Sequence, residues 1–501
     1  MKVTFTGNAF RLLLPALFSL LGCGPGLAQS GFPGRSVQGE VEAGGLVSTD
    51  RATPFWLRTN LYGIVPLESP IVTLRASLRR EYGRLDTTRA ARRFDWGFVV
   101  NPVVNAGREN GLLLPEAFVK VKYGMIELFG GRRREVIGLG DTTLTSGFLI
   151  GSGNALPIPK IQIGTRGYAS LPFLGRFVAV SASFGHAWFN VPYIRGAYLH
   201  QKHLYLRFGK PRSRLKVHAG INHQVQWGGE AEYLKGPAGL SANGKLPSSL
   251  KDYGFIISAI VPGNWAERGY ISFDSYKIGN HLGSYDFGLE FNTRQGNLML
   301  YHQHPYEDVS SLLFMNFPDG LWGFSWANVP PLTRSPAFRL ERLTLEYLMT
   351  VDQTASTFYV PGSSYQGADN YFNHGQYKEG WSYRNRSIGT PFLAPITNYR
   401  PEVQAQSGGF FPNNRVRMWY AGARGLVKNR VGLTLRASYS QNFGTIPVPY
   451  AAAIGQFSAL AGAEIPLSRW PNTVLTTSLA VDGKGMFPAA AGGFFSVRKR
   501  W

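Results

Sequence analysis

The most regular feature of the chain is an alternation of hydrophobic and polar residues with a period of two. The range 71–79 is an example, with Val72, Leu74, Ala76 and Leu78 set against Thr73, Arg75, Ser77 and Arg79. The same alternation runs through 203–210, 285–292 and 431–440. Successive side chains of a β-strand point to opposite faces of a sheet. Each segment is therefore predicted to be a strand with one apolar and one polar face.

Such segments recur between Val37 and Trp501, and we count roughly 16 to 20 of them, each about 9–13 residues long, the length that a tilted membrane strand needs. A soluble β-sandwich or propeller is the alternative, but its strands are usually shorter and its exposed faces carry dense Lys and Glu. An open sheet of this size would also leave unpaired edges, which closure in lipid removes. The predicted fold class is all-β, a transmembrane antiparallel β-barrel of about 18 strands (range 16–20) with long external loops.

Aromatic residues gather near the ends of the predicted strands, where the interfacial girdles of membrane barrels lie. The groups are Phe55-Trp56, Trp96, Trp188-Phe189, Trp322 and Trp419-Tyr420. The last predicted strand ends on Trp501. This ending resembles the terminal signal of bacterial outer-membrane barrels, and it predicts contact with the barrel assembly machinery.

The N-terminal segment, 1–28, is predicted to be a cleaved secretory signal peptide. Lys2 and Arg11 precede a short apolar run that is too short to span a bilayer. Small residues at Gly26 and Ala28 favour cleavage after Ala28, which leaves 29–501 as a single outer-membrane barrel domain. The alternative is a lipobox-like string that would make Cys23 a lipidated N-terminus. Because Cys23 is the only cysteine, a disulfide scaffold is excluded.

The chain is strongly basic although it holds few charged residues. It has 52 Lys and Arg against 30 Asp and Glu, a formal net charge of +22, and only 16% of its residues are charged. Ordinary soluble proteins have about 25%. A hydrophobic content of 44% excludes a disordered basic protein. A lipid-facing wall accounts for the low charge, and the surplus arginines are then expected in the lumen, at the rims and in the loops.

Two stretches interrupt the strand rhythm and are predicted to be long loops, at about 133–172 and 353–414. Loops of this length are usually functional. The second combines groups that suit a sugar chain, because rings stack on pyranose faces, Asn and Asp bond hydroxyl groups, and Arg holds carboxylates. The alternative is that these residues pack a cap over the barrel mouth. The candidates for binding polysaccharide are Asp369, Asn370, Tyr371, Tyr377, Trp381, Tyr383, Arg384 and Arg386.

Arginines on the polar faces of the strands, and a run of three at the start of the first loop, are predicted to face the lumen and to favour anions. They are Arg75, Arg79, Arg132, Arg133, Arg134, Arg207 and Arg436.

The sequence offers little enzymatic chemistry. His302 and His304 share a strand face beside Glu307 and Asp308, a set more typical of a polar lumen network than of a metal site. The motifs Gly-x-Ser-x-Gly and His-Glu-x-x-His do not occur, and the glycines at 138–141 lack the strand–helix setting of a nucleotide site. We therefore expect no catalytic residue, no metal and no cofactor, and nucleic acid is not an expected partner of an exported barrel.

Seven longer strings occur in order between about residue 40 and the C-terminus, at 131–141, 152–164, 200–207, 222–229, 317–323, 369–371 and 388–391. Together they resemble the Wzi-type capsule assembly family, in the form typical of Bacteroidetes-like bacteria. The motif positions carried over from this resemblance are Gly138, Gly140, Asp141, Asn154, Pro157, Pro159, Lys160, His223, Gln226, Trp227, Asp319 and Trp322.

The resemblance implies an outer-membrane barrel that attaches or organises capsular or extracellular polysaccharide as a lectin, not as an enzyme. Its expected partners are an acidic polysaccharide and outer-membrane lipids. Two alternatives stay open: an anion-preferring porin or export channel without a lectin role, and a barrel enzyme acting on lipid or glycan. The enzyme requires Ser, His and an acid within hydrogen-bond reach. Enterobacterial relatives carry a small periplasmic helical bundle, and no amphipathic segment suited to it is evident here.

Overall fold

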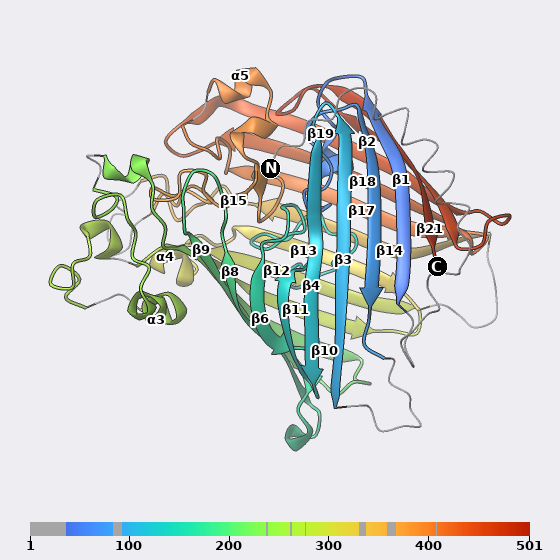
Figure 1. Cartoon of the computed structure of the whole chain (residues 1–501), viewed down its shortest axis with the longest axis horizontal. Coiled ribbons are helices and arrows are strands. Elements are labelled where there is room, and N and C mark those ends of the chain that lie inside the picture. Colours follow the sequence, from blue (N-terminus) through green and yellow to red (C-terminus); the bar gives the residue numbers. More distant parts are fainter. Residues whose placement is uncertain are drawn as a thin grey trace.

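The computed structural model describes residues 37–83, 93–236, 239–260, 263–275, 277–329, 337–357, 367–406 and 408–501. The predicted signal peptide, its cleavage site after Ala28 and Cys23 lie outside the described residues. The described chain forms a closed antiparallel β-barrel of 18 strands, which confirms the predicted fold class (Figure 1).

Each barrel strand pairs with the next one along the chain, and the short β7 continues β6 along β8. The strands are β1(Gln38–Ser48), β2(Ile71–Arg80), β3(Phe94–Gly107), β4(Gly111–Tyr123), β5(Ile126–Arg132), β6(Lys160–Thr165), β7(Ala169–Ser170), β8(Val178–Trp188), β9(Tyr198–Phe208), β10(Leu215–Trp227), β11(Asn280–Asn292), β12(Gly296–Tyr306), β13(Gly320–Asn328), β14(Phe338–Met349), β17(Val416–Val427), β18(Val431–Gly444), β19(Pro449–Pro466), β20(Thr473–Asp482) and β21(Ala490–Arg500). A separate hairpin is formed by β15(Ser382–Tyr383) and β16(Arg386–Ser387).

In the described ranges, helices are short and lie in the connections. They are α2(Phe55–Arg58), α3(Leu250–Ser258), α4(Val309–Leu312) and α5(Pro401–Gln404), with 3₁₀ turns at Pro172–Leu174, Glu232–Lys235, Ser272–Ser275 and Ile396–Asn398. None of the helices in the described ranges has the length and apolar character needed to cross a membrane.

The barrel closes where the first and last strands pair. Antiparallel pairing of β1 with β21 runs from Glu40↔Arg500 to Ser48↔Gly492. At the end of this seam, Gly39 and Trp501 exchange two backbone hydrogen bonds of 3.0 and 3.1 Å. The indole ring of Trp501 covers Gly39, where an added Cβ would lie 2.5 Å from Nε1. Closure leaves no unpaired sheet edge, as a barrel in lipid requires.

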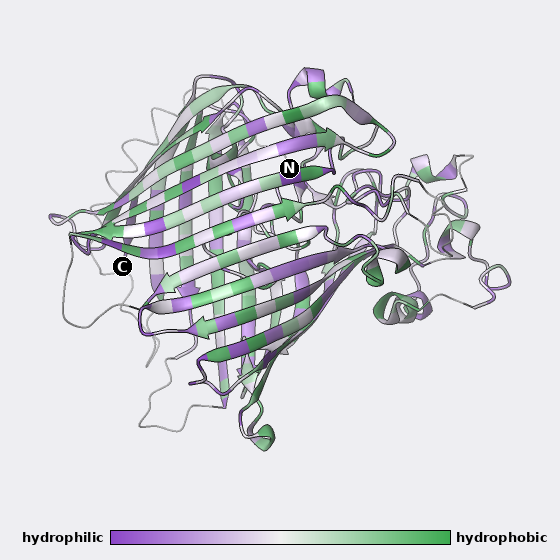
Figure 2. Cartoon of the chain, turned by 180° about the vertical axis from the view of Figure 1, so that it is seen from behind, coloured by the Kyte–Doolittle hydropathy of each residue, from purple (hydrophilic) through white to green (hydrophobic). Residues whose placement is uncertain are grey.

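Hydrophobic and polar residues alternate along the strands (Figure 2). The apolar set is the more exposed one and lies on the outer face of the barrel. Leu204, Leu435 and Leu479, for example, are exposed on that face. An aromatic row crosses seven neighbouring strands on the outer face, each member directly opposite the next: Phe287, His302, Trp322, Tyr347, Trp419, Tyr439 and Phe457. This row has the position and composition of an interfacial girdle.

The girdle prediction was right for some aromatic residues and wrong for others. Trp96, Trp188, Trp322 and Trp419 are exposed. Phe55 and Trp56 are not part of a girdle, because α2 carries them into the barrel, where they are buried. Tyr420 is also buried, since it follows the outward Trp419 in β17 and so points to the opposite face. Phe189 comes directly after β8 and is buried against Tyr383 of the second loop.

Connections of very different length separate the two ends of the barrel. The long-loop end carries the connections 49–70, 133–159, 228–279, 307–319 and 350–415, whereas the short-turn end carries 124–125, 293–295, 428–430 and both ends of the barrel sequence. The predicted loop 353–414 matches 350–415. The predicted loop 133–172 ends earlier, because Lys160–Thr165 resumes the alternation and exposes Ile161 and Ile163 on the outer face. The sequence did not reveal the long connection 228–279.

Three connections from the long-loop end fill the lumen. They contribute α2, the segment 137–150 and the hairpin β15–β16, whose apolar side chains belong to one large buried cluster. Wall carboxylates accept backbone N–H groups from these segments: Asp286 from Leu139 at 3.1 Å, Glu346 from Ser146 at 2.6 Å and Asp482 from Phe55 at 2.8 Å. We call these segments the plug.

Candidate functional site

A cleft of about 220 Å³ lies at the long-loop end, between the plug and the first strands. Four parts of the chain meet there: the connection 49–70, the tight turn between β3 and β4, Leu156 of the connection 133–159, and the β15–β16 hairpin. Its polar lining comes from Asn105, Glu109, Asn110, Arg384, Asn385 and Arg386. This set contains amides, a carboxylate and guanidinium groups, the groups that recognise sugar hydroxyls and carboxylates.

The hairpin β15–β16 presents its two turn residues to solvent. Arg384 and Asn385 both have left-handed backbones, with φ of 52° and 61°, and both are exposed. This is the two-residue turn whose twist matches a hairpin, and it normally takes Asn-Gly. An arginine in this conformation costs about 1–2 kcal/mol, so the hairpin holds Arg384 outward against a local conformational preference.

Two buried polar atoms of the cleft have no hydrogen-bond partner within the described chain. They are Nη1 of Arg386 and Oδ1 of Asn105. The other ends of both side chains are fixed, since Arg386 Nη2 donates to the carbonyl of Val65 at 2.7 Å and Asn105 Nδ2 donates to the carbonyl of Ile64 at 2.9 Å. Buried polar groups are usually paired. An unpaired donor and an unpaired acceptor therefore belong to two side chains that line one cleft.

The electrostatics of the cleft are dominated by arginine. Burial lowers the pKa of Arg386 to about 9, and the nearby charge of Arg58 acts in the same direction. Arg386 still carries its charge at neutral pH. Glu109 is the acidic member of the lining, and its carboxylate accepts the backbone N–H of Glu68 at 2.8 Å. A carboxylate-bearing ligand would supply the charge that compensates the two arginines.

The predicted aromatic residues of the second loop do not reach the cleft surface. Tyr371, Tyr377, Trp381 and Tyr383 are buried in the plug cluster. Three of them are fixed by polar contacts, from Tyr371 to Asp319 at 3.0 Å, from Tyr377 to the Gly228 carbonyl at 3.1 Å and from Trp381 to the Ile150 carbonyl at 2.9 Å. Their rings pack the cap, which was the alternative interpretation of the sequence.

Asp369 and Asn370 lie apart from the cleft. The Asp369 carboxyl bonds Asp308 and accepts from Thr354 at 2.9 Å. Its burial, together with the charge of Asp308, raises the pKa of Asp369 to about 9. The side chain of Asn370 accepts from Asn414 at 2.6 Å and holds the loop in place. Of the eight predicted binding residues, the cleft thus brings together Arg384 and Arg386.

Most of the predicted lumen arginines face inward and are already engaged. Arg75 pairs with Glu42 at 3.3 Å, Arg133 with Glu127 and Glu135, and Arg134 with Glu116 at 3.7 Å. The remaining arginines form no ion pair with the described residues. Arg79 donates a hydrogen bond to Gln38, and Arg207 lies over the ring of Tyr168. Arg436 lies over the ring of Trp56 and donates to the Thr143 carbonyl, and Arg132 lies near Tyr383 and Arg384.

The motif positions mainly build the plug and its supports. Gly138 and Gly140 have φ of 150° and 146°, and a Cβ there would lie 2.7 Å from Gln303 and 2.8 Å from the Tyr301 ring. Asp141 pairs with Arg342, Lys160 with Glu135, and Asn154 bonds the carbonyl of Ser387. Pro157 and Pro159 lie in the connection directly before β6. The side-chain amide of Gln226 donates to the carbonyl of Gly380 in the second loop. The carboxylate of Asp319 accepts the backbone N–H groups of residues 352 and 353. His223, Trp227 and Trp322 lie on the outer face.

The structure shows where the histidines lie that the sequence offered for a lumen network, a metal site or a serine-based active site. His302 and His304 do not face the lumen but lie on the outer wall, stacked on Trp322 and Phe314. Ser183 Oγ bonds His203 Nδ1 at 2.8 Å, and no carboxylate in the described ranges bonds that imidazole. In the same part of the chain, no three His, Cys, Asp or Glu side chains are arranged to hold a metal ion.

Sequence reasoning missed Asn105, Glu109 and Asn110. Glu109 and Asn110 lie in the turn between two strongly alternating strands, Gly111 begins the second of them, and Asn-Gly is a typical hairpin signal. The turn itself was therefore predictable. Its place beside Arg384 was not, because that depends on how the plug folds.

The fold of the chain is similar to that of several solved outer-membrane proteins. Wzi of Escherichia coli, described as an outer-membrane protein involved in group 1 capsule assembly and as a carbohydrate-binding β-barrel, is 16% identical with a TM-score of 0.57, over 99% of this chain and 89% of that chain. OccK5 and OprD of Pseudomonas aeruginosa align with TM-scores of 0.45 at 10% and 9% identity, over 93% and 95% of this chain and 97% and 95% of theirs. No protein-family model and no curated protein sequence matches this sequence. The fold is that of a Wzi-like outer-membrane barrel.

Proposed function

We propose that this protein is an outer-membrane barrel that holds an acidic capsular or extracellular polysaccharide at its external surface without cleaving it. The observation that carries the proposal is the cleft at the long-loop end, with two arginines and two unpaired buried polar atoms. In outer-membrane barrels the long loops face outward and the short turns face the periplasm. The cleft is then open to the cell exterior.

The chemistry of the cleft fits one unit of a glycan chain. Its volume of about 220 Å³ is below the ~300–1,000 Å³ of pockets that enclose a drug-sized ligand. A polymer would therefore lie across the surface and insert a single sugar. Arg384 would bond a carboxylate, while Arg386 Nη1 and Asn105 Oδ1 would donate to and accept from hydroxyl groups.

The plug favours this role over that of an open channel. Phe148, Leu149 and Trp381 are buried in the middle of the barrel, and wall carboxylates fix their segments by hydrogen bonds. A polymer or a stream of ions would have to displace this packed cluster. The solved Wzi structure, described as a carbohydrate-binding barrel, supports the same conclusion.

The test is capsule retention on living cells. A strain carrying Arg384→Gln with Asn110→Ala is expected to release more polysaccharide into the medium, because a charged and a neutral contact are lost at the cleft. The matched control is Arg195→Gln, an exposed arginine in the connection between β8 and β9, outside the cleft. Equal retention by both strains, at equal barrel levels in the outer membrane, would contradict the proposal.

A further inference from the structure

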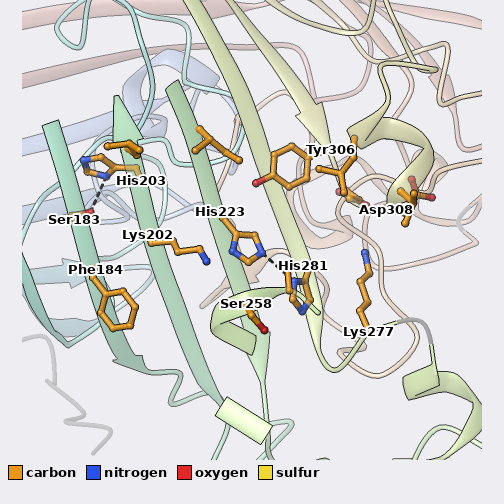
Figure 3. Close-up of a pocket in the computed structure, with 16 residues that line it drawn as sticks. Ser183, Phe184, Lys202, His203, His223, Ser258, Lys277, His281, Tyr306 and Asp308 are labelled. Atoms are coloured by element: carbon orange, nitrogen blue, oxygen red, sulfur yellow. Dashed lines mark hydrogen bonds between the residues drawn. The ribbon is translucent and has the colours of Figure 1, made fainter. Parts of the chain in front are cut away.

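A second pocket lies on the outside of the barrel, on the opposite side of the wall from the plug. It has a volume of about 520 Å³ and is bounded by β8 to β11, the end of α3 and α4 (Figure 3). This volume is within the ~300–1,000 Å³ range of small-molecule sites. The pocket is therefore large enough to take the headgroup and first carbons of a lipid.

The floor of the pocket belongs to the membrane-facing wall. Phe184, Leu204 and Ile221 line it and remain 39%, 44% and 36% exposed. Each lies on the outer face of its strand, where the neighbouring apolar residues continue toward the short-turn end. A ligand in the pocket can thus extend an apolar tail along the barrel without leaving the lipid phase.

The connection 228–279 forms one side of the pocket because α3 folds back against the outer wall. Tyr253 stacks on Trp227 with ring centroids 5.0 Å apart, and Ile256 joins a small apolar cluster with Val225. Other apolar residues of the same elements point away from the wall: Leu250 is 87%, Ile260 63% and Val309 55% exposed. Exposed apolar residues beside a lipid-facing wall indicate that α3 and α4 lie in the membrane interface.

Two lysines supply positive charge at the pocket. Lys202 comes from β9 and donates to the carbonyl of Ile257. Lys277 comes from the connection before β11 and has no hydrogen bond or ion pair with the described residues. Burial lowers the pKa of Lys277, and the charges of Asp308 and Glu307 act in the opposite direction. An ammonium group without a bonded partner, next to an apolar floor, is the pattern expected for a lipid phosphate.

The acidic residues of the pocket are engaged elsewhere. Asp308 accepts the backbone N–H of Ser311 at 3.1 Å as the N-cap of α4 and also bonds Asp369. Glu307 accepts the backbone N–H of Phe372 at 3.0 Å. Two histidines that line the pocket, His223 and His281, are hydrogen-bonded to each other at 3.0 Å. The second ring nitrogen of His281 bonds the Ile278 carbonyl at 2.9 Å. Lys277 thus has three N–H donors without a hydrogen bond in the described chain, and Lys202 keeps two donors besides the one given to Ile257.

We propose that this outer pocket binds a phosphate-bearing lipid of the surrounding membrane. The phosphate lies between Lys202 and Lys277, and the acyl chains run over Phe184, Leu204 and Ile221. The bound lipid ties the connection 228–279 to the wall and so fixes the barrel's depth in the outer leaflet. This site is independent of the glycan cleft.

The test is native mass spectrometry of the full barrel in detergent, with three probes: dioctanoyl phosphatidic acid, dioctanoylglycerol and inorganic phosphate. We expect the phosphatidic acid to bind about tenfold more tightly than either other probe. Its phosphate contacts the two lysines and its acyl chains contact the apolar floor, whereas each other probe has only one of these two parts. The double variant Lys202→Gln/Lys277→Gln is expected to lose about tenfold in this affinity.

Lys251→Gln is the matched control, because Lys251 is an exposed lysine of α3 that does not line the pocket. It should bind as the unchanged protein does. Equal binding of dioctanoylglycerol and phosphatidic acid, or unchanged binding by the double lysine variant, would overturn the proposal. A second variant, Ile221→Trp, fills the floor with the lysines intact and should also weaken binding of phosphatidic acid.

Discussion

At the scale of single residues, the structure places Arg384 and Arg386 in one cleft and buries the aromatic residues that the sequence grouped with them. A hairpin tip of two left-handed residues exposes Arg384. The aromatic residues around it are buried in the plug. Composition alone cannot separate a ring that stacks on a sugar from a ring that packs a cap, because both need the same apolar surface. Burial separates them here.

Asp369 gives a prediction about pH. Its folded-state pKa of about 9 lies far above the ordinary value of 3.8, so the folded loop keeps a proton that the unfolded loop has released. The stability of the loop should therefore fall as pH rises between about 4 and 9, by up to about tenfold in opening equilibrium per pH unit. Hydrogen exchange of peptides from 367–381, corrected for intrinsic rates, measures this.

Asp369→Asn keeps a neutral hydrogen-bonding group beside Asp308 and should flatten this pH dependence. A smaller slope should persist, because the pKa of Glu307 in the same cluster is raised by burial to about 7. Glu402→Gln is the control, since Glu402 is an exposed carboxylate of the same loop. A slope that Asp369→Asn leaves unchanged would show that another group controls the loop.

At the scale of elements, the strands were predictable and the plug was not. Alternation in a strand is local, so 71–79 and 431–440 identify β2 and β18 directly. The segment 137–150 has no period that predicts its course, because its partners come from distant strands: Asp286, Gln303 and Glu346. The connection 228–279 was missed because its helix, α3, is short and packs on the outer wall rather than in a core.

Glu346 tests how the plug is held. Its carboxylate accepts from the hydroxyls of Thr145 and Tyr301 and from the backbone of Ser146. Glu346→Ala leaves these donors unpaired, at a cost of about 1–3 kcal/mol for each buried group. We expect faster proteolysis within 137–150, and single-channel conductance in planar bilayers where the unchanged barrel shows none.

Glu341→Ala is the matched control, because Glu341 lies on the same strand but pairs with Arg339 and Arg424 away from the plug. It should leave both measurements unchanged. Steady conductance through the unchanged barrel would contradict a closed lumen and favour the porin alternative.

At the scale of the whole molecule, the sequence predicted that the surplus arginines lie in the lumen, at the rims and in the loops, but it did not show which of them form ion pairs. Many lumen arginines have acidic partners, such as Arg75 with Glu42 and Arg498 with Glu464. The lumen is therefore less cationic than the arginine count suggests. Two cations that form no ion pair with the described residues lie at the surfaces, Arg384 in the cleft and Lys277 in the outer pocket. Both proposed ligands, a polysaccharide and a lipid phosphate, are accordingly anionic.

The most direct test of the central claim is the affinity of the purified barrel for the acidic polysaccharide of its own cell surface. We predict binding that weakens from about 0.05 M to about 0.5 M salt, because screening reduces charge-driven contacts. We also predict an increase of about tenfold in Kd for Arg384→Gln, with no change for Arg195→Gln. Equal affinity of the unchanged protein and Arg384→Gln, or equal binding of the polysaccharide after its carboxylates are reduced, would contradict the account.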